Sequence, residues 1–254
     1  MKAGPACIFK KLIKSKKAYR IKDEKYIDDR LKIIEGIVSV NDIKVKAKEF
    51  DLTITEYLTS VLIKSIGELK SKSKKPIVIT IPVNLRKYYP TYTVRNFFSV
   101  VNIDYSYNID SFKDITKSVK KSFKEKLDKE NIKDKMNSMI KLEDIFIVRL
   151  IPVFIKDLVL KIACNIENKY QTMTLSNIGI INMPDIYKKY IDYFSVFTST
   201  SKIQMCMCSY NDKMVISFSS KFVNSEIEKN FFKFLSKVGI DVIINTNDYG
   251  DYDE

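Results

Sequence analysis

The chain has 254 residues, of which 45% are hydrophobic and 12% aromatic, so it can bury a core and is not disordered. Its 44 Lys and Arg residues outnumber 31 Asp and Glu residues, for a formal charge of +13. The chain contains no His. This excludes every mechanism in which the chain itself must supply an imidazole as a general base or as a zinc ligand.

The positive charge comes mainly from Lys, because Arg occurs at only five positions. The chain is also rich in Ile, Asn, Tyr and Phe, whose codons are AT-rich, so genome composition accounts for much of the Lys excess. No cluster of Arg and aromatic residues accompanies the charge. We therefore do not expect nucleic-acid binding.

The four Cys residues form no CxxC pair and no zinc-binding spacing, so we expect no metal site and a reduced, cytoplasmic protein. The opening residues have too short an apolar run for a signal peptide, and no segment reaches membrane-spanning length. The most apolar stretch runs from Ile145 to Leu160 and is interrupted by charged residues. It predicts a buried core helix.

In chain order, residues 1–25 are basic and weakly patterned, which predicts a tail or a linker remnant. Ser39 is a candidate cap for a short helix that ends near Phe50. Thr53 and Glu56 then form a capping box for a second helix. Apolar residues follow on one face of that helix, at Leu58, Val61, Leu62, Ile66 and Leu69.

Residues 76–85 are continuously apolar and predict a strand covered on both faces, and residues 97–107 predict a second strand. Asp110 or Ser111 opens a charged helix that runs toward Lys129. A further charged helix leads into an apolar helix over residues 145–166, which Pro152 should kink or restart.

After Tyr170 the pattern becomes β-rich. It predicts strands ending at Gly179 and over residues 193–200, 202–210, 213–222 and 240–246, and a helix over residues 226–238. The tight turn Asn211-Asp212 joins two of the strands. The fold class is therefore α/β (α+β): one domain over residues 26–247, with a large, partly antiparallel sheet, helices on one side and an acidic tail at 248–254.

Three segments in order, ITEYLTSVLIKSI, ITIPVNLR and TVRNFFSVVNI, resemble the chloramphenicol-acetyltransferase-like and condensation-domain superfamily. They are most similar to the C-terminal lobe of bacterial alcohol acetyltransferases. That family has a strand ending in P-V-(N/D)-x-R and a G-N-F turn before the next strand. Pro82 to Arg86 match the first motif, and Arg95, in place of Gly, precedes Asn96 and Phe97. The resemblance implies one lobe of a two-layer sandwich.

The segment TLSNIG is similar to a strand of dihydrolipoamide acyltransferases in which a Ser hydroxyl donates to the tetrahedral oxyanion. The resemblance thus implies Ser176 as an oxyanion donor, Arg86 as a wall of the site, and Asn84, Asn96 and Asn177 as substrate-binding residues. Two alternatives stay open. Ser176 and Asn177 could merely satisfy backbone groups at a strand end, and Arg86 could pair with a buried carboxylate to stabilise a turn.

The catalytic element of the resembled family is H-H-x-x-x-D-G, whose second His is the base. The segment in the comparable place is SSKFVNS, residues 219–225, where both His positions are Ser, Asp is Asn and Gly is Ser. A Ser hydroxyl has no basicity near pH 7. In two-lobed members the working motif lies in the N-terminal lobe, so the resemblance implies a C-terminal lobe whose base lies elsewhere.

Two functions remain compatible with the sequence. The first is the C-terminal lobe of an O-acyltransferase that binds no tight cofactor, uses acetyl-CoA or another acyl-CoA as co-substrate and acylates a small-molecule acceptor. It would be inactive without a His-bearing N-terminal lobe. The second is a non-catalytic, half-fold binding or relic protein that self-associates through its exposed lobe interface. The paired carboxylates are interpreted as solvated charges, with Asp28 and Asp29 on different faces of a helix and Glu226 and Glu228 on a solvent edge. Cys206 and Cys208 are interpreted as core residues on one strand face.

Overall fold

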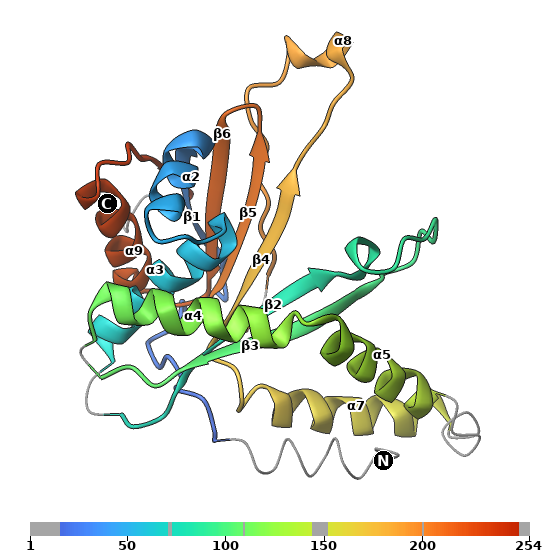
Figure 1. Ribbon diagram of the computed structural model, residues 1–254. Helices are drawn as coiled ribbons and strands as arrows, with labels where there is room; N and C mark the ends of the chain where they lie inside the picture. Colours follow the sequence, from blue (N-terminus) through green and yellow to red (C-terminus); the bar gives the residue numbers. More distant parts are fainter. Residues whose placement is uncertain (1–15, 71–72, 109, 144–151, 200, 249–254) are drawn as a thin grey trace.

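The computed structural model describes residues 16–70, 73–108, 110–143, 152–199 and 201–248 (Figure 1). The described helices and strands are interspersed along the chain, with a 3₁₀ turn η1 after β2. They are β1 (Lys32–Ser39), α2 (Val40–Glu49), α3 (Ile54–Leu69), β2 (Ile77–Asn84), η1 (Leu85–Lys87), β3 (Phe98–Tyr105), α4 (Phe112–Lys126), α5 (Lys129–Glu143), α7 (Val153–Glu167), β4 (Met173–Ile180), α8 (Asp185–Lys188), β5 (Gln204–Tyr210), β6 (Lys213–Ser220), α9 (Glu226–Lys237) and β7 (Ile243–Thr246).

Seven strands form one open, mixed sheet in the order β3-β2-β4-β5-β6-β1-β7. Two neighbouring pairs, β2 with β4 and β4 with β5, are parallel, and the other pairs are antiparallel. Only Ile79 with Met173 and Thr80 with Thr174 join β2 to β4. Beyond these residues, Figure 1 shows the β2-β3 ribbon diverging from β4 and β5.

Helices α2, α3, α4 and α9 cover one face of the sheet (Figure 1). Their apolar side chains and alternate residues of the strands form one hydrophobic core, which sits between the two layers. Leu62 of α3, Phe231 of α9 and Met205 of β5 are all fully buried there. The predicted class, a mixed α/β lobe with helices on one side, is confirmed.

The start of each helix follows from its capping residue. The Ser39 side chain accepts from Asp42 N, and Ser111 caps α4 in the same way. At α3 the capping box is complete, because Thr53 Oγ1 accepts from Glu56 N and Glu56 Oε2 accepts from Thr53 N at 2.7 Å. These three predicted helix starts are confirmed.

The predicted buried helix over residues 145–166 is wrong in its burial. Residues 144–151 lie outside the described part of the chain, and α7 begins directly after Pro152, as a restart at that residue predicted. Its apolar side chains are largely exposed, with Phe154 at 73% and Leu158 at 59%. Apolar composition therefore predicted the helix, but not a surface to cover it.

Two further predictions fail, and one strand was missed. The strand expected over 193–200 is irregular chain in its described part, residues 193–199, and it covers the face of β5 and β6 opposite the helices. The alternation of its apolar residues resembles a strand, but their neighbours are the side chains of the sheet. Asp28 and Asp29 lie in a turn and not on a helix, and Asp29 has φ of 57°. Strand β1 was not predicted at all.

The connection between the parallel strands β4 and β5 is a long arm, described over residues 181–199 and 201–203, that carries α8 away from the body of the molecule (Figure 1). Ile186, Tyr187 and Tyr190 on this arm are exposed. Its return segment is anchored to the sheet, since Cys208 Sγ donates to Phe194 O and Ser219 Oγ donates to Thr198 O at 2.6 Å.

Among the described helices, none has the length and apolarity needed to cross a membrane.

Candidate functional site: the β6–α9 connection and the ends of β2 and β4

The segment that resembles the catalytic motif ends β6 and leads into α9. Ser219 and Ser220 are each 1% exposed. The Ser219 hydroxyl donates to Thr198 O, and the Ser220 hydroxyl accepts from Phe222 N. Both hydroxyls that the resemblance aligns with His are thus engaged in hydrogen bonds with backbone groups, and neither is a base.

The rest of this connection is held by the buried Lys32 of β1. Lys32 Nζ donates to Val223 O and to Ser225 Oγ, both at 2.6 Å, and Asn224 Oδ1 accepts from Glu226 N. Burial lowers the pKa of Lys32, although the Glu228 carboxylate opposes that shift. The connection is therefore held in place by hydrogen bonds from the Lys32 ammonium group and within the turn.

Glu228 corrects one sequence prediction, because its side chain is not solvated. It is 1% exposed and lines a cavity of about 160 Å³ together with Tyr19, Lys22 and Asn224. Neither of its carboxylate oxygens accepts a hydrogen bond from another described residue. Burial raises the pKa of Glu228, against the opposing effects of its own backbone N–H and Lys32. Its place on the apolar face of α9, beside Ile227 and Phe231, is the sequence signal that could have found it.

Ser176 and Asn177 lie on β4, close to the start of α3. Asn177 Nδ2 donates to Thr55 Oγ1 at 2.9 Å, and Asn177 Oδ1 accepts from Gly179 N at 2.8 Å. The second bond stabilises a bulge at which Gly179 adopts φ of 88°. Asn177 thus has the structural role that was one of the two alternatives. The half-buried Ser176 hydroxyl has no hydrogen-bond partner among the described residues.

Arg86 lies in the turn after β2 and braces the loop between β2 and β3. Its Nη2 donates to Thr93 O at 2.8 Å and to Arg95 O at 2.7 Å. The Asn84 side chain accepts from Arg86 N and caps η1, and Asn96 is exposed on the same loop. Arg86 therefore stabilises a turn, as its alternative interpretation held, but through backbone carbonyls and not through a carboxylate.

The five predicted site residues thus form two groups. Asn84, Arg86 and Asn96 belong to the β2-β3 ribbon, and Ser176 and Asn177 belong to β4, from which that ribbon diverges (Figure 1). No hydrogen bond joins the two groups within the described part of the chain. Sequence order alone could not show this separation, because it depends on where the sheet opens.

Comparison with known proteins places the fold. No family model and no curated protein matches the sequence. The cyclization-docking bidomain of a nonribosomal peptide synthetase from Sorangium cellulosum matches with a TM-score of 0.54 and 12% identity, over 91% of this chain and 47% of that one. A trichothecene 15-O-acetyltransferase from Fusarium sporotrichioides matches with a TM-score of 0.52 and 11% identity, over 90% and 50%.

A wax ester synthase/diacylglycerol acyltransferase from Marinobacter aquaeolei matches with a TM-score of 0.51 and 10% identity, over 92% of this chain and 57% of that one. The chain thus spans about half the length of these solved structures. Its fold is that of these acyltransferase and condensation-type structures, which is the fold that the sequence resemblance implied.

Proposed function

We propose that this chain is one lobe of an acyl-CoA-dependent O-acyltransferase of the alcohol acetyltransferase kind, and that a partner lobe supplies the catalytic His. The observation that carries the proposal is the β6–α9 connection. It is the segment of this lobe comparable to the catalytic motif, yet it contains Ser219 and Ser220 in place of His, and both hydroxyls form hydrogen bonds with backbone groups. A lobe with this fold and no imidazole needs its base from outside.

The arm after β4 supports a lobe partner. It projects from the body of the molecule and exposes Ile186, Tyr187 and Tyr190, which are the kinds of side chain that a protein interface covers. Self-association of this chain would also cover these side chains. Only a His-bearing partner lobe would both cover them and supply the catalytic base.

In the proposed reaction the His of the partner lobe takes the proton of a small alcohol. The alcohol oxygen attacks the thioester carbonyl of acetyl-CoA or another acyl-CoA, and the Ser176 hydroxyl donates to the resulting oxyanion. Collapse of this intermediate breaks the C–S bond, and the CoA thiolate takes the proton from the imidazolium. Ser176 suits this role because its hydroxyl is not occupied by another described residue.

The test begins with the DNA upstream of the coding sequence, searched for an H-H-x-x-x-D-G lobe. The two lobes are then produced together, and acetyl transfer from acetyl-CoA to short alcohols is measured. We expect activity only with both lobes present, and a fall of about 30- to 1,000-fold for Ser176→Ala. Ser118→Ala on α4 is the control. Transfer that stays at the background rate with both lobes present contradicts the proposal.

A second candidate is a non-catalytic binding lobe. It is favoured by Arg86, whose guanidinium is occupied by two backbone carbonyls, and by the structural role of Asn177. If the paired lobes bind an acyl-CoA without turnover, this second function replaces the first.

A further inference from the structure

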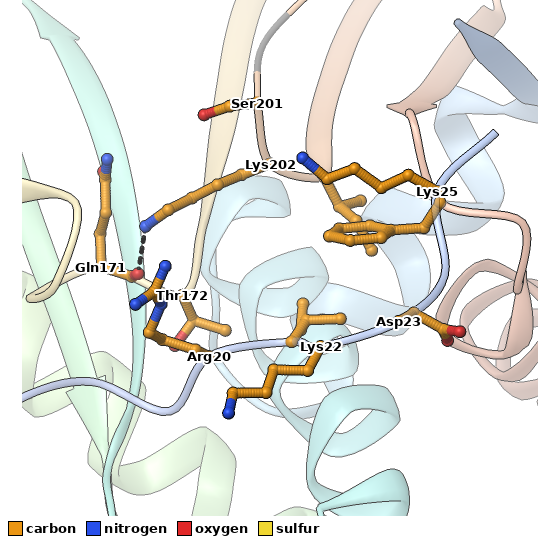
Figure 2. Close-up of a pocket in the computed structure, with 11 residues that line it drawn as sticks. Arg20, Lys22, Asp23, Lys25, Gln171, Thr172, Ser201 and Lys202 are labelled. Atoms are coloured by element: carbon orange, nitrogen blue, oxygen red, sulfur yellow. Dashed lines mark hydrogen bonds between the residues drawn. The ribbon is translucent and has the colours of Figure 1, made fainter. Parts of the chain in front are cut away.

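A cavity of about 250 Å³ lies between the segment 20–25, residues 171–172 just before β4, and the segment 201–203 (Figure 2). It is separate from Ser176 and from the Arg86 loop, none of whose residues lines it. Four basic side chains line it against a single carboxylate. The lining residues with charge are Arg20, Lys22, Lys25, Lys202 and Asp23.

Three of the four basic side chains around this cavity have no bonded partner in the described part of the chain. Within the described residues, the side chains of Arg20, Lys22 and Lys25 take part in no hydrogen bond or ion pair. The Asp23 carboxylate accepts from Glu24 N, and Figure 2 shows it turned away from Arg20 and Lys202. The cavity is therefore strongly electropositive, with cationic groups available to a ligand.

Lys202 is held rigidly at one side of the cavity. Its Nζ donates to Asn168 O at 2.7 Å and to Gln171 O at 2.6 Å, and Figure 2 shows the Arg20 guanidinium close to it. Burial, and then the charge of Arg20, lower the pKa of Lys202 to about 8, while Glu167 opposes the shift. Two cations that repel each other in a partly dry site are stabilised by an anion between them.

The other side of the cavity is partly apolar. The Phe222 ring lies there with Ile21 and Ile203, and Lys25 Nζ sits 5.8 Å from the ring centroid. In Figure 2 Lys25 reaches toward the cavity from the side opposite Arg20. The volume is below that of a typical drug-sized site, so it suits a phosphate group with a small organic substituent.

We propose that this cavity binds the phosphate group of a small phosphomonoester. Arg20 contacts the phosphate oxygens, Lys25 and Lys202 complete the positive surroundings, and Phe222 packs against the organic part. Arg suits this role because its planar guanidinium donates two hydrogen bonds to a phosphate. The proposal does not depend on the acyl-transfer function and stands if that function fails.

The test is calorimetric titration of the full chain with inorganic phosphate and with phenyl phosphate at moderate ionic strength. We expect one saturable site for each, with phenyl phosphate binding more tightly because it also covers Phe222. The double variant Arg20→Gln/Lys25→Gln should weaken both by about tenfold or more. Lys44→Gln, which removes an exposed charge on α2, is the matched control and should change neither.

Two results overturn the proposal. One is the absence of saturable binding to wild-type protein whose fold is confirmed by circular dichroism. The other is equal binding by wild type and the double variant, which would place the anion elsewhere on the basic surface. Because Arg20 and Lys25 are exposed and form no ion pair with described residues, the double variant should fold.

Discussion

Helices α3 and α7 are similar in length and both strongly apolar, yet one is buried and the other is exposed. Leu58 and Leu62 of α3 are fully buried, whereas Leu158 and Leu160 of α7 are each 59% exposed. Helix α3 packs on the sheet and contacts α4 and α9, while α7 lies below the sheet in Figure 1. An apolar helix sequence therefore indicates that the helix is favoured to pack against another surface. The tertiary structure decides whether the same chain provides that surface.

The pair Leu62→Ala and Leu158→Ala tests this comparison with the largest expected effect. Leu62→Ala should lower the free energy of unfolding by about 2–5 kcal/mol, since it leaves a cavity in the core. Leu158→Ala should change it by no more than about 0.5 kcal/mol. Denaturant unfolding measures both. Equal losses would show that α7 is covered in solution.

Glu228→Gln tests the converse of the exposed apolar residues on α7, namely a carboxylate that is buried on α9. Its folded-state pKa is raised, so the folded protein is stabilised by protonation and loses stability as pH rises from the ordinary value of 4.5 through the raised one. The variant should gain about 1–3 kcal/mol at pH 7 and nothing near pH 4. The exposed neighbour Glu226, changed to Gln, serves as the control. A gain that does not vary with pH would argue against a buried charge.

Removal of the α3 cap should have a smaller effect. Thr53→Ala breaks one half of the capping box and should cost about 1 kcal/mol in thermal or denaturant unfolding. Thr53→Ser keeps the hydroxyl and should restore most of this loss. If the Ser variant is as unstable as the Ala variant, the methyl group and not the hydrogen bond is responsible.

The smallest change in stability is expected for a polar α7. The triple variant Leu158→Gln/Val159→Gln/Ile162→Gln should unfold within about 0.5 kcal/mol of wild type, because these side chains are about half exposed or more. We expect wild type to self-associate as its concentration rises, and the variant to do so less. Light scattering over a concentration series measures this. A wild-type protein that stays monomeric throughout the series would contradict the prediction of self-association.

Local signals predicted the elements well. The cap residues Ser39, Thr53 and Ser111 mark three helix starts, and the turn Asn211-Asp212 joins β5 to β6 as expected, with Asn211 at φ of 51°. Cys206 and Cys208 are both buried on β5. These features depend on residues within a few positions of one another.

The site was harder to predict. The sequence named Arg86 and Ser176, and the structure places them on separate branches of the sheet. It did not indicate Arg20 and Lys202, which are 182 positions apart and meet only because the segment 20–25 runs beside the start of β4. Long-range contacts of this kind leave no short-range pattern.

By itself, the sequence determined the absence of an imidazole base, the order of most helices and strands, and the resemblance to an acyltransferase lobe. These follow from residue identity, capping and periodicity. The tertiary structure decided that α7 is exposed, that Glu228 is buried, and that four cations surround one cavity. Burial and electrostatic potential are sums over neighbours from distant parts of the chain, and only the folded arrangement specifies those neighbours.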